Sequence, residues 1–557
     1  MVRRILRLIS LDVSGVHAAA YLLAASAFSS QLLALIRDHL LAGTFGAGLK
    51  LDIYYAAFRI QDFIFFSVAS LVSLAVLIPF LVEAVEKSKE ETRAFLDSIF
   101  TVFFISVVIV SGVAFFLVPY IVPVIFPGLV NKGFNTDLFF ITRLLLLSPL
   151  ALGLSNLLGS VTQTYRKFFI YALSPLLYNV GIIIGIVAFY PVFGLKGLGF
   201  GVILGAILHL LIQMPFIISE GLFPRLTLRI RFKEVKRLVL LSLPRTLTLS
   251  LNHIAMLVLA GMASVLAEGS ISVLNFSLNL GLVPVSIIGA SYSVAAFPIL
   301  VRHFLKEEKD NFNEHLRVSL RHIIFWSFPA VMLLIVLRAQ IVRVILGAGA
   351  FSWNDTRLTA ACLALLALSV IAQNITLLLV RAFYAMGDTK KPLFITIFSS
   401  TLTIGLGYGA LYFFSHNSFF RDFMESLFRI EDVTGSEVLM LPLAYTIGSF
   451  INLGLLWTFF GRALSSASLS VGGAAFHSFS ASVVMGFVGY KALEWTGQFL
   501  NIDTFIGVFS QGVFGGLCGI VSWVLMLYLF KNKELMEIIA ALQKRILGSD
   551  VVQTDPA

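Results

Sequence analysis

The sequence predicts an all-α polytopic membrane protein, and three features of its 557 residues support that prediction. Hydrophobic residues make up 58% of the chain and charged residues only 13%, whereas soluble domains carry about 25% charged residues. Apolar windows of about 20 residues follow one another, each long enough to cross roughly 30 Å of hydrocarbon as a helix. Most basic residues lie between these windows rather than inside them. A soluble globular domain is therefore excluded.

Fourteen candidate spans can be placed along the chain, and their even number predicts that both termini lie on the same side of the membrane. They begin near residues 17, 54, 96, 138, 168, 197, 238, 270, 320, 358, 392, 438, 472 and 504.

The distribution of Lys and Arg predicts which side that is. If the N-terminus is cytoplasmic, most of the 40 basic residues fall in cytoplasmic segments, as the positive-inside rule requires. Examples are "PRLTLRIRFKEVKR" at 224–237 and "KNKELMEIIAALQKR" at 531–545. The net charge of +10 is then an orientation signal and a contact for anionic membrane lipids, and it does not indicate nucleic acid binding.

A weak internal repeat predicts how the spans are grouped. At a shift of 218 to 219 residues, "LLAGTFG" in the first span matches "VLAGMAS" in the seventh, and "VLIPFL" matches "AAFPIL". Because the repeat covers six spans, an even number, the two copies share one orientation and form parallel bundles. The predicted segments are a cytoplasmic N-terminus at 1–16, a six-helix bundle at 17–220, a basic cytoplasmic linker at 221–237, a second six-helix bundle at 238–463, two additional transmembrane helices at 464–531 and a cytoplasmic tail at 532–557.

Charged residues inside the predicted spans are the candidates for function, because an ionisable group at mid-bilayer costs at least ~2.5 kcal/mol and normally faces a cavity or a partner. Arg37 and Asp38 are adjacent in the first span, and Arg59 follows in the second. Adjacent residues project about 100° apart on a helix, so at least one of the first two needs a partner on another helix or in a cavity. Two interpretations of Arg37 are open: a position in a water-filled cavity, or snorkelling at the outer interface.

The loop at 415–437 carries Phe419, Phe423 and Leu427 at helical spacing. This spacing predicts a short amphipathic helix, either at the membrane interface or simply on the surface.

Enzyme and cofactor signatures are not found in the sequence. It contains no G-x-x-x-x-G-K-[ST] loop, no H-E-x-x-H and no G-x-S-x-G motif. Both cysteines, Cys362 and Cys518, fall in apolar windows, and the histidines lack metal-ligand spacing. We therefore expect a protein that is not an enzyme, with no catalytic residue, no metal and no cofactor.

Three longer motifs resemble the MurJ/MviN lipid II flippases of the multidrug, oligosaccharidyl-lipid and polysaccharide exporter superfamily. They are "LIRDHLLAGTFGAGLKLDIYYAAFRI", "AEGSISVLNFSLNLGLVP" and "RAFYAMGDTKKP", and the likeness runs through roughly residues 17–530. The resemblance implies two bundles in a V shape around a cationic central cavity. The implied substrate is a saccharide linked to undecaprenyl diphosphate, carried across the bacterial cytoplasmic membrane by alternating access.

The resemblance also implies site residues. Arg37, Asp38 and Asp52 match the family pattern, and Arg37 is the residue expected to contact the diphosphate, since a guanidinium fork suits phosphate oxygens. Asp52 also begins the second span, where a carboxylate suits the first turn of a helix.

The sequence also departs from the family pattern. Arginines of the family align here with Gln31, with Asn279 and with the pair at 65–66, "FF". Three further arginines could supply the missing charge within the substrate-binding set: Arg59, Arg143 and Arg245.

Three functions stay open at this point. The first is lipid II flipping. The second is flipping of another polyprenyl-linked saccharide, or multidrug export within the same superfamily. The third is a membrane scaffold that does not transport and recruits cell-wall synthesis proteins through its basic loops.

Overall fold

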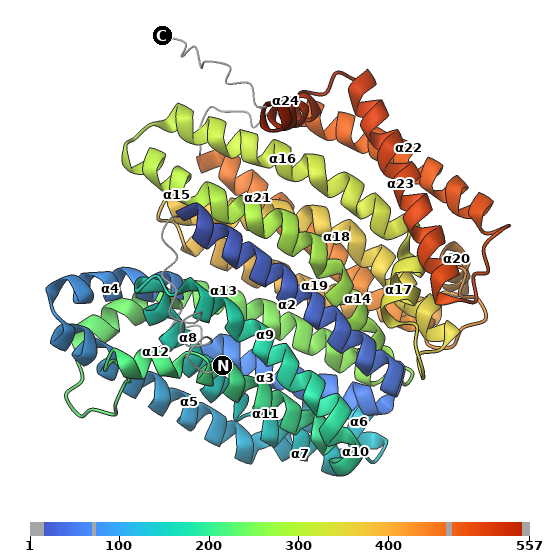
Figure 1. Cartoon of the computed structure of the whole chain (residues 1–557). Helices are drawn as coiled ribbons and strands as arrows, with labels where there is room; N and C mark the ends of the chain where they lie inside the picture. Colours follow the sequence, from blue (N-terminus) through green and yellow to red (C-terminus); the bar gives the residue numbers. More distant parts are fainter. Residues whose placement is uncertain (1–15, 69–73, 464–470, 548–557) are drawn as a thin grey trace, which may run out of the picture. The chain divides into compact units, whose positions relative to one another are not determined.

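The structure is a computed structural model that describes residues 16–68, 74–463 and 471–547, and Figure 1 shows that this part of the chain is built from helices. No β-strand occurs among the described residues. The prediction of an all-α membrane protein is confirmed. Three predicted segments lie partly outside the described residues. They are the N-terminus at 1–16, the two additional helices at 464–531, of which the first residues are not described, and the tail at 532–557, of which the end is not described.

Eleven helical stretches in the described part of the chain are long and apolar enough to cross a membrane. Helix α3, Leu49–Val68, is not among them, because Asp52, Arg59 and Asp62 put charge into every long window along it. The predicted total of fourteen spans remains a prediction.

The chain divides into two compact units. Unit 1 comprises Met1–Phe276, Ile345–Leu358 and Thr396–Ala444, and unit 2 comprises Ser277–Val344, Thr359–Ile395 and Tyr445–Ala557. This grouping follows contacts in space, so each unit contains pieces from distant parts of the sequence. The predicted division into sequential six-helix bundles at 17–220 and 238–463 remains a prediction.

Unit 1 contains the N-terminal helices and parts of several later ones. Its complete helices are α2 (Val16–Phe45), α3, α4 (Leu74–Lys87), α5 (Lys89–Ile125), α6 (Pro127–Asn131), α7 (Asn135–Leu145), α8 (Ser148–Thr164), α9 (Phe168–Ile184), η2 (Gly185–Phe189), α10 (Tyr190–Phe193), α11 (Lys196–Leu211), α12 (Met214–Ser219), α13 (Phe232–Ser264), α20 (Ser418–Phe428) and η4 (Ser436–Leu439).

Unit 2 contains η3 (Val285–Ala290), α15 (Ser291–Leu305), α16 (Lys309–Val336), α22 (Gly472–Thr496), α23 (Phe505–Leu529) and α24 (Lys533–Leu547). Five helices contribute residues to both units: α14 (Ser270–Pro284), α17 (Arg338–Leu346), α18 (Trp353–Ala385), α19 (Lys390–His416) and α21 (Met440–Ala463).

Glycines hold α11 close to α9 and to η2, which continues α9, in unit 1. A Cβ added at Gly201 would lie 2.4 Å from the Cα of Gly185, and one added at Gly181 would lie 2.2 Å from the Cα of Gly205. Only glycine permits such an approach, and small residues at four-residue spacing are typical of packing between membrane helices. These glycines fix the position of α9, which carries Asn179.

Helix α5 begins with Ser88 as its N-cap. The Ser88 hydroxyl accepts a hydrogen bond from the N–H of Glu91 at 3.1 Å, which satisfies one of the free donors at the helix start. Helix α20 begins in a similar way, with the Asn417 side chain accepting from the N–H of Phe420 at 2.9 Å. The short helix predicted within 415–437 is therefore confirmed.

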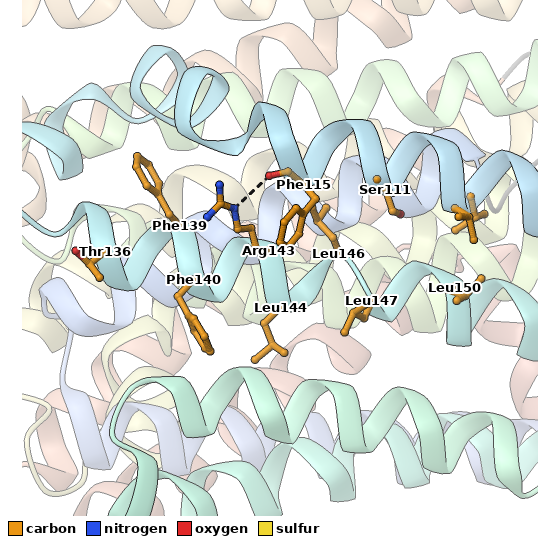
Figure 2. A pocket seen from close by; sticks show the side chains of 13 residues that line it. Ser111, Phe115, Thr136, Phe139, Phe140, Arg143, Leu144, Leu146, Leu147 and Leu150 are labelled. Atoms are coloured by element: carbon orange, nitrogen blue, oxygen red, sulfur yellow. Dashed lines mark hydrogen bonds between the residues drawn. The ribbon is translucent and has the colours of Figure 1, made fainter.

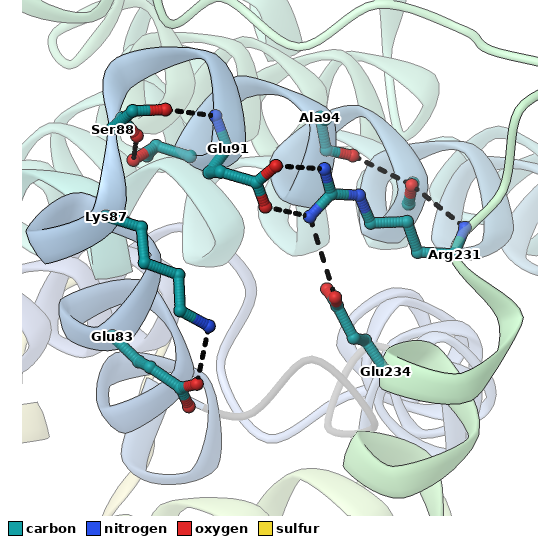
Figure 3. Close-up of polar contacts among 9 residues, drawn as sticks. Glu83, Lys87, Ser88, Glu91, Ala94, Arg231 and Glu234 are labelled. Carbon is teal, nitrogen blue, oxygen red and sulfur yellow. Dashed lines mark hydrogen bonds and ion pairs between the residues drawn. The ribbon is translucent and has the colours of Figure 1, made fainter.

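The predicted basic linker is bound along α5 through its backbone. Arg225 N–H donates to Asp97 Oδ1 at 2.7 Å, and Arg231 N–H donates to Ser98 Oγ at 3.2 Å. The Arg231 guanidinium pairs with Glu91 at 2.5 Å and with Glu234 at 3.5 Å, as Figure 3 shows. Helix α13 begins at Phe232, so the end of the predicted linker segment is helical.

In unit 2, α16 packs against the pair α22 and α23. The Ser478 hydroxyl donates to the carbonyl of Phe325 at 2.9 Å, and the Trp523 ring lies 5.0 Å from the Phe325 ring, centroid to centroid. The aromatic contact buries the middle of α16, and the hydroxyl satisfies its hydrogen bond on a backbone acceptor, as expected for a polar group in an apolar interior.

Candidate functional site: a buried polar network in unit 1

The first part of the network joins α2 to α9. The Arg37 guanidinium donates to Asp38 Oδ1 from Nε at 3.0 Å and from Nη2 at 2.8 Å, and from Nη1 to Asn179 Oδ1 at 3.2 Å. The Arg37 side chain is 19% exposed and the Asp38 side chain 4%. Arg37 therefore has a partner on another helix, and its long side chain also folds back onto the neighbouring carboxylate.

The orientation of the Asn179 amide follows from its other contacts. Its Nδ2 donates to the carbonyl of Pro175 at 3.2 Å and to the hydroxyl of Ser30 at 3.4 Å. Because these two acceptors hold the amide nitrogen, the amide oxygen faces Arg37. A buried ion pair with a third hydrogen-bonded partner is the arrangement in which the charges are best tolerated away from water.

The second part of the network joins α3 to the start of α14. The carboxylate of Asp52, 3% exposed, accepts from the N–H of Gly269 at 2.7 Å, from the N–H of Ser272 at 2.8 Å and from the Ser272 hydroxyl at 2.7 Å. Asp52 therefore caps the first turn of α14 from a different helix. Gly269 has a φ of +86°, and a Cβ there would lie 1.9 Å from the carbonyl oxygen of Ala47, so the turn requires glycine.

The third part of the network lies further along the same two helices. Arg59 Nη2 donates to Asn275 Oδ1 at 2.5 Å, and Asn275 Nδ2 donates to the carbonyl of Ile271 at 2.8 Å. The rings of Tyr55 and Phe276 also meet edge to face, with their centroids 5.8 Å apart. Helices α3 and α14 are thus joined by two polar contacts and by an aromatic contact.

The remaining predicted residues lie outside these contacts. Arg143, on α7, donates from Nε to the carbonyl of Phe115 at 3.2 Å and lines a separate cavity of about 770 Å³. Arg245 is half-buried on α13, and Asn279, on α14, belongs to unit 2. The predicted substrate-binding set has seven members, and their assignment remains a prediction: Arg37, Asp38, Asp52, Arg59, Arg143, Arg245 and Asn279.

The pair "FF" at 65–66, where the family resemblance implies an arginine, is in contact with a histidine. The Phe66 ring stacks on the His253 imidazole, with centroids 3.8 Å apart and planes 12° apart. The His253 imidazole on α13 therefore lies beside Phe66, where the family resemblance implies an arginine.

The sequence analysis missed Asn179 and Asn275, the two side chains that orient the arginines. Both are amides inside strongly apolar stretches, "LLYNVGI" and "SVLNFSL". A buried amide needs several hydrogen-bond partners, and that requirement is the signal that could have identified them.

Comparisons with known proteins agree with this fold. The profile of the family described as "Lipid II flippase MurJ" matches residues 41–510. The "Probable lipid II flippase MurJ" of Rickettsia prowazekii is 25% identical over 444 residues, which cover 79% of this chain and 82% of that protein. The protein of the same name from Thermotoga maritima is 28% identical over 384 residues, covering 68% of this chain and 76% of that one.

Two solved structures share the fold. "Lipid II flippase MurJ, inward closed conformation" has a TM-score of 0.71 and 22% identity, and covers 92% of this chain and 98% of that chain. The inward-facing conformation of a multidrug resistance MATE family transporter of the MOP superfamily has a TM-score of 0.60 and 16% identity, covering 79% of this chain and 96% of that chain.

The fold, with eleven helical stretches in the described residues that are long and apolar enough to cross a membrane, defines a multi-pass membrane protein. Within that class, the chain belongs to the lipid II flippase MurJ family, whose profile covers most of its length.

Proposed function

We propose that this protein flips lipid II, the lipid-linked peptidoglycan precursor, from the inner to the outer leaflet of the bacterial cytoplasmic membrane. The observation that carries the proposal is the match of residues 41–510 to the lipid II flippase family, combined with a buried arginine at position 37. The chain is then a transporter and not an enzyme, and it contributes to cell-wall biogenesis.

Arg37 is the residue proposed to contact the diphosphate of the substrate. Its guanidinium offers a planar set of donors that matches phosphate oxygens bidentately, and in the structure Asp38 and Asn179 occupy those donors. When the diphosphate enters, it replaces Asp38 as the partner of Arg37. Asp38 thus stabilises the empty site and competes with weakly charged ligands.

Arg59 is proposed to supply the second cation, held by Asn275 on α14. Asp52 acts on the same site as a positioning residue, because its oxygens accept hydrogen bonds from the first turn of the helix that carries Asn275 and Asn279. Arg245 belongs to the predicted substrate-binding set as a supporting charge.

The orientation proposed for the chain has both termini in the cytoplasm and the basic linker at 221–237 on the same side. Anionic lipids then contact the cytoplasmic loops. The two predicted bundles form a V around a cationic cavity. Alternating access of these bundles moves the headgroup of lipid II across the membrane. Binding of cell-wall synthesis proteins to the basic loops is a further part of this proposal.

A second candidate function is flipping of another polyprenyl-linked saccharide or export of small molecules. It is favoured by the shared fold with a MATE transporter and by the residues Gln31, Phe65 and Asn279, which stand where the family resemblance implies arginines. Fewer cations in the site would suit a less anionic substrate.

Complementation of a bacterium depleted of its own lipid II flippase tests the proposal. Wild type should restore growth, and Arg37→Ala should fail at an equal membrane level. Arg421→Ala, which removes an exposed arginine from α20, is the matched control and should restore growth. If wild type inserts correctly but fails to restore growth, the second candidate function becomes the better explanation. If Arg37→Ala restores growth while the linker variant that replaces the basic residues of 224–237 does not, the scaffold function is favoured.

A further inference from the structure

A cavity within unit 1 lies between α5, α7 and α8. It has a volume of about 770 Å³, within the range of about 300–1,000 Å³ typical of small-molecule sites. Its lining, shown in Figure 2, consists of thirteen residues: Val107, Val108, Ser111, Gly112, Phe115, Thr136, Phe139, Phe140, Arg143, Leu144, Leu146, Leu147 and Leu150. All but four are hydrophobic, and only Arg143 is charged.

The guanidinium of Arg143 is incompletely satisfied by the protein. Its Nε donates to the carbonyl of Phe115 at 3.2 Å, and its Cζ lies 4.9 Å from the centre of the Phe115 ring. Neither Nη group donates to any residue in the described part of the chain. The Nη donors of this half-buried side chain are therefore open to a ligand in the cavity.

Three polar side chains stand among the apolar residues of the lining. Thr136 lies in the first turn of α7, Arg143 lies in its last turn, and Ser111 lies on α5. One end of the lining is formed by Val107, Leu147 and Leu150. A single cation beside a long apolar wall matches an amphiphile with one anionic group.

The cavity opens onto the outer surface of the unit. The side chains of Val108, Phe115 and Leu147 are 45%, 41% and 56% exposed, so the cavity is continuous with the lipid-facing surface of the unit.

We infer that this cavity binds an anionic glycerophospholipid, with its phosphate on Arg143 and an acyl chain along Val107 and Leu150. The charge of the headgroup follows from the open donors of Arg143, because a bidentate guanidinium contact selects a phosphate oxygen pair. The site is separate from the polar network of Arg37, Asp52 and Arg59. The inference does not depend on the proposed function.

Two substitutions test the two halves of the site. Arg143→Gln removes the cation. Gly112→Leu fills the cavity, and the Cβ of the new residue meets no atom within 4 Å, so the helix accommodates it. Lys132→Gln and Gly409→Leu are the matched controls: Lys132 is an exposed cation outside the cavity, and Gly409 is an equally open helical glycine on α19.

The measurement is lipid retention by the purified full-length protein. The protein is equilibrated with phosphatidylglycerol or phosphatidylcholine, washed in detergent, and the bound lipid is counted by mass spectrometry. We expect wild type and both controls to retain about one phosphatidylglycerol per chain. Arg143→Gln and Gly112→Leu should reduce retention about tenfold or more, given the strength of charge-assisted hydrogen bonds and of apolar burial.

Three results would overturn the inference. Equal retention of phosphatidylglycerol by wild type and by both cavity variants would show that the cavity is not the site. Equal retention of phosphatidylcholine would remove the role of the anionic headgroup. Displacement of the phospholipid by an equimolar amount of undecaprenyl diphosphate would assign the cavity to the polyprenyl substrate instead. Unchanged thermal unfolding of each variant makes these comparisons valid.

Discussion

Asp52 and Ser272 are joined by two hydrogen bonds to one carboxylate oxygen, Oδ1, from the Ser272 N–H at 2.8 Å and from its hydroxyl at 2.7 Å. The other oxygen accepts from Gly269 at 2.7 Å. This pairing holds the start of α14 against α3, and it gives Asp52 a structural role that its sequence position alone did not reveal.

Asp52→Ala is expected to destabilise the protein. It leaves the N–H groups of Gly269 and Ser272 unpaired in a buried position, which costs about 3 kcal/mol in total. Thermal unfolding of the purified protein, followed by tryptophan fluorescence, measures the loss. Asp503→Ala, in an exposed loop, is the control and should unfold at the wild-type temperature. An Asp52→Ala variant as stable as this control would contradict the capping role.

Substitution of Asn179 is expected to change ligand binding in a charge-dependent way. Asn179→Asp puts a carboxylate 3.2 Å from Arg37, where it competes with the diphosphate and should weaken lipid II binding about tenfold or more. Asn179→Ala removes a neutral partner and should weaken it much less. Titration of purified protein with fluorescent lipid II measures both, and equal affinities of the two variants would contradict the proposed role of Arg37.

The contact between α11 and η2, which continues α9, is expected to tolerate no side chain. Gly201→Ala places a Cβ 2.4 Å from Gly185 Cα, and relief of this overlap should cost about 1–3 kcal/mol. Gly409→Ala, whose Cβ meets nothing within 4 Å, should be neutral or slightly stabilising because alanine favours the helix. Denaturation midpoints compare the two. Equal midpoints would show that the helices can separate without loss.

The loop after α20 is expected to loosen at low pH. Arg357 pairs with Asp432 at 2.6 Å, and this hydrogen bond lowers the pKa of the Asp432 carboxyl below its ordinary value of 3.8. Because the folded pKa is lowered, the stabilisation is present at neutral pH and is lost as the pH falls through the lowered pKa. Hydrogen exchange of residues 429–435, corrected for intrinsic rates, should show protection at neutral pH that disappears on acidification. In Asp432→Asn the protection should be weak at every pH, and a wild-type profile in this variant would contradict the assignment.

Much of the fold could be predicted from the sequence because bilayer-spanning helices leave a strong signal. Runs of about 20 apolar residues and the basic segments between them predicted an all-helical membrane protein, and the spacing of Phe419, Phe423 and Leu427 predicted α20. The grouping into two units could not be predicted in this way, because segments such as Ile345–Leu358 pack with residues far away in the chain.

The site could be predicted only in part, because charge is visible in the sequence and its partner is not. Arg37 stood out because cations are rare in spans, but Asn179 became recognisable only once α9 was seen beside α2. Asp52 matched a family pattern, yet its partner Ser272 is 220 residues away, so its capping role depends on tertiary contact.

The central claim, that this protein moves lipid II and uses Arg37 to do so, is tested most directly in proteoliposomes. Fluorescent lipid II is placed in both leaflets, and a membrane-impermeant reductant reports the fraction that exchanges from the inner leaflet. The account predicts exchange well above that of protein-free vesicles for wild type and for Arg421→Ala, and a loss of about tenfold or more for Arg37→Ala at equal reconstitution. Exchange by Arg37→Ala at the wild-type rate, or wild-type exchange no faster than in empty vesicles, would contradict it.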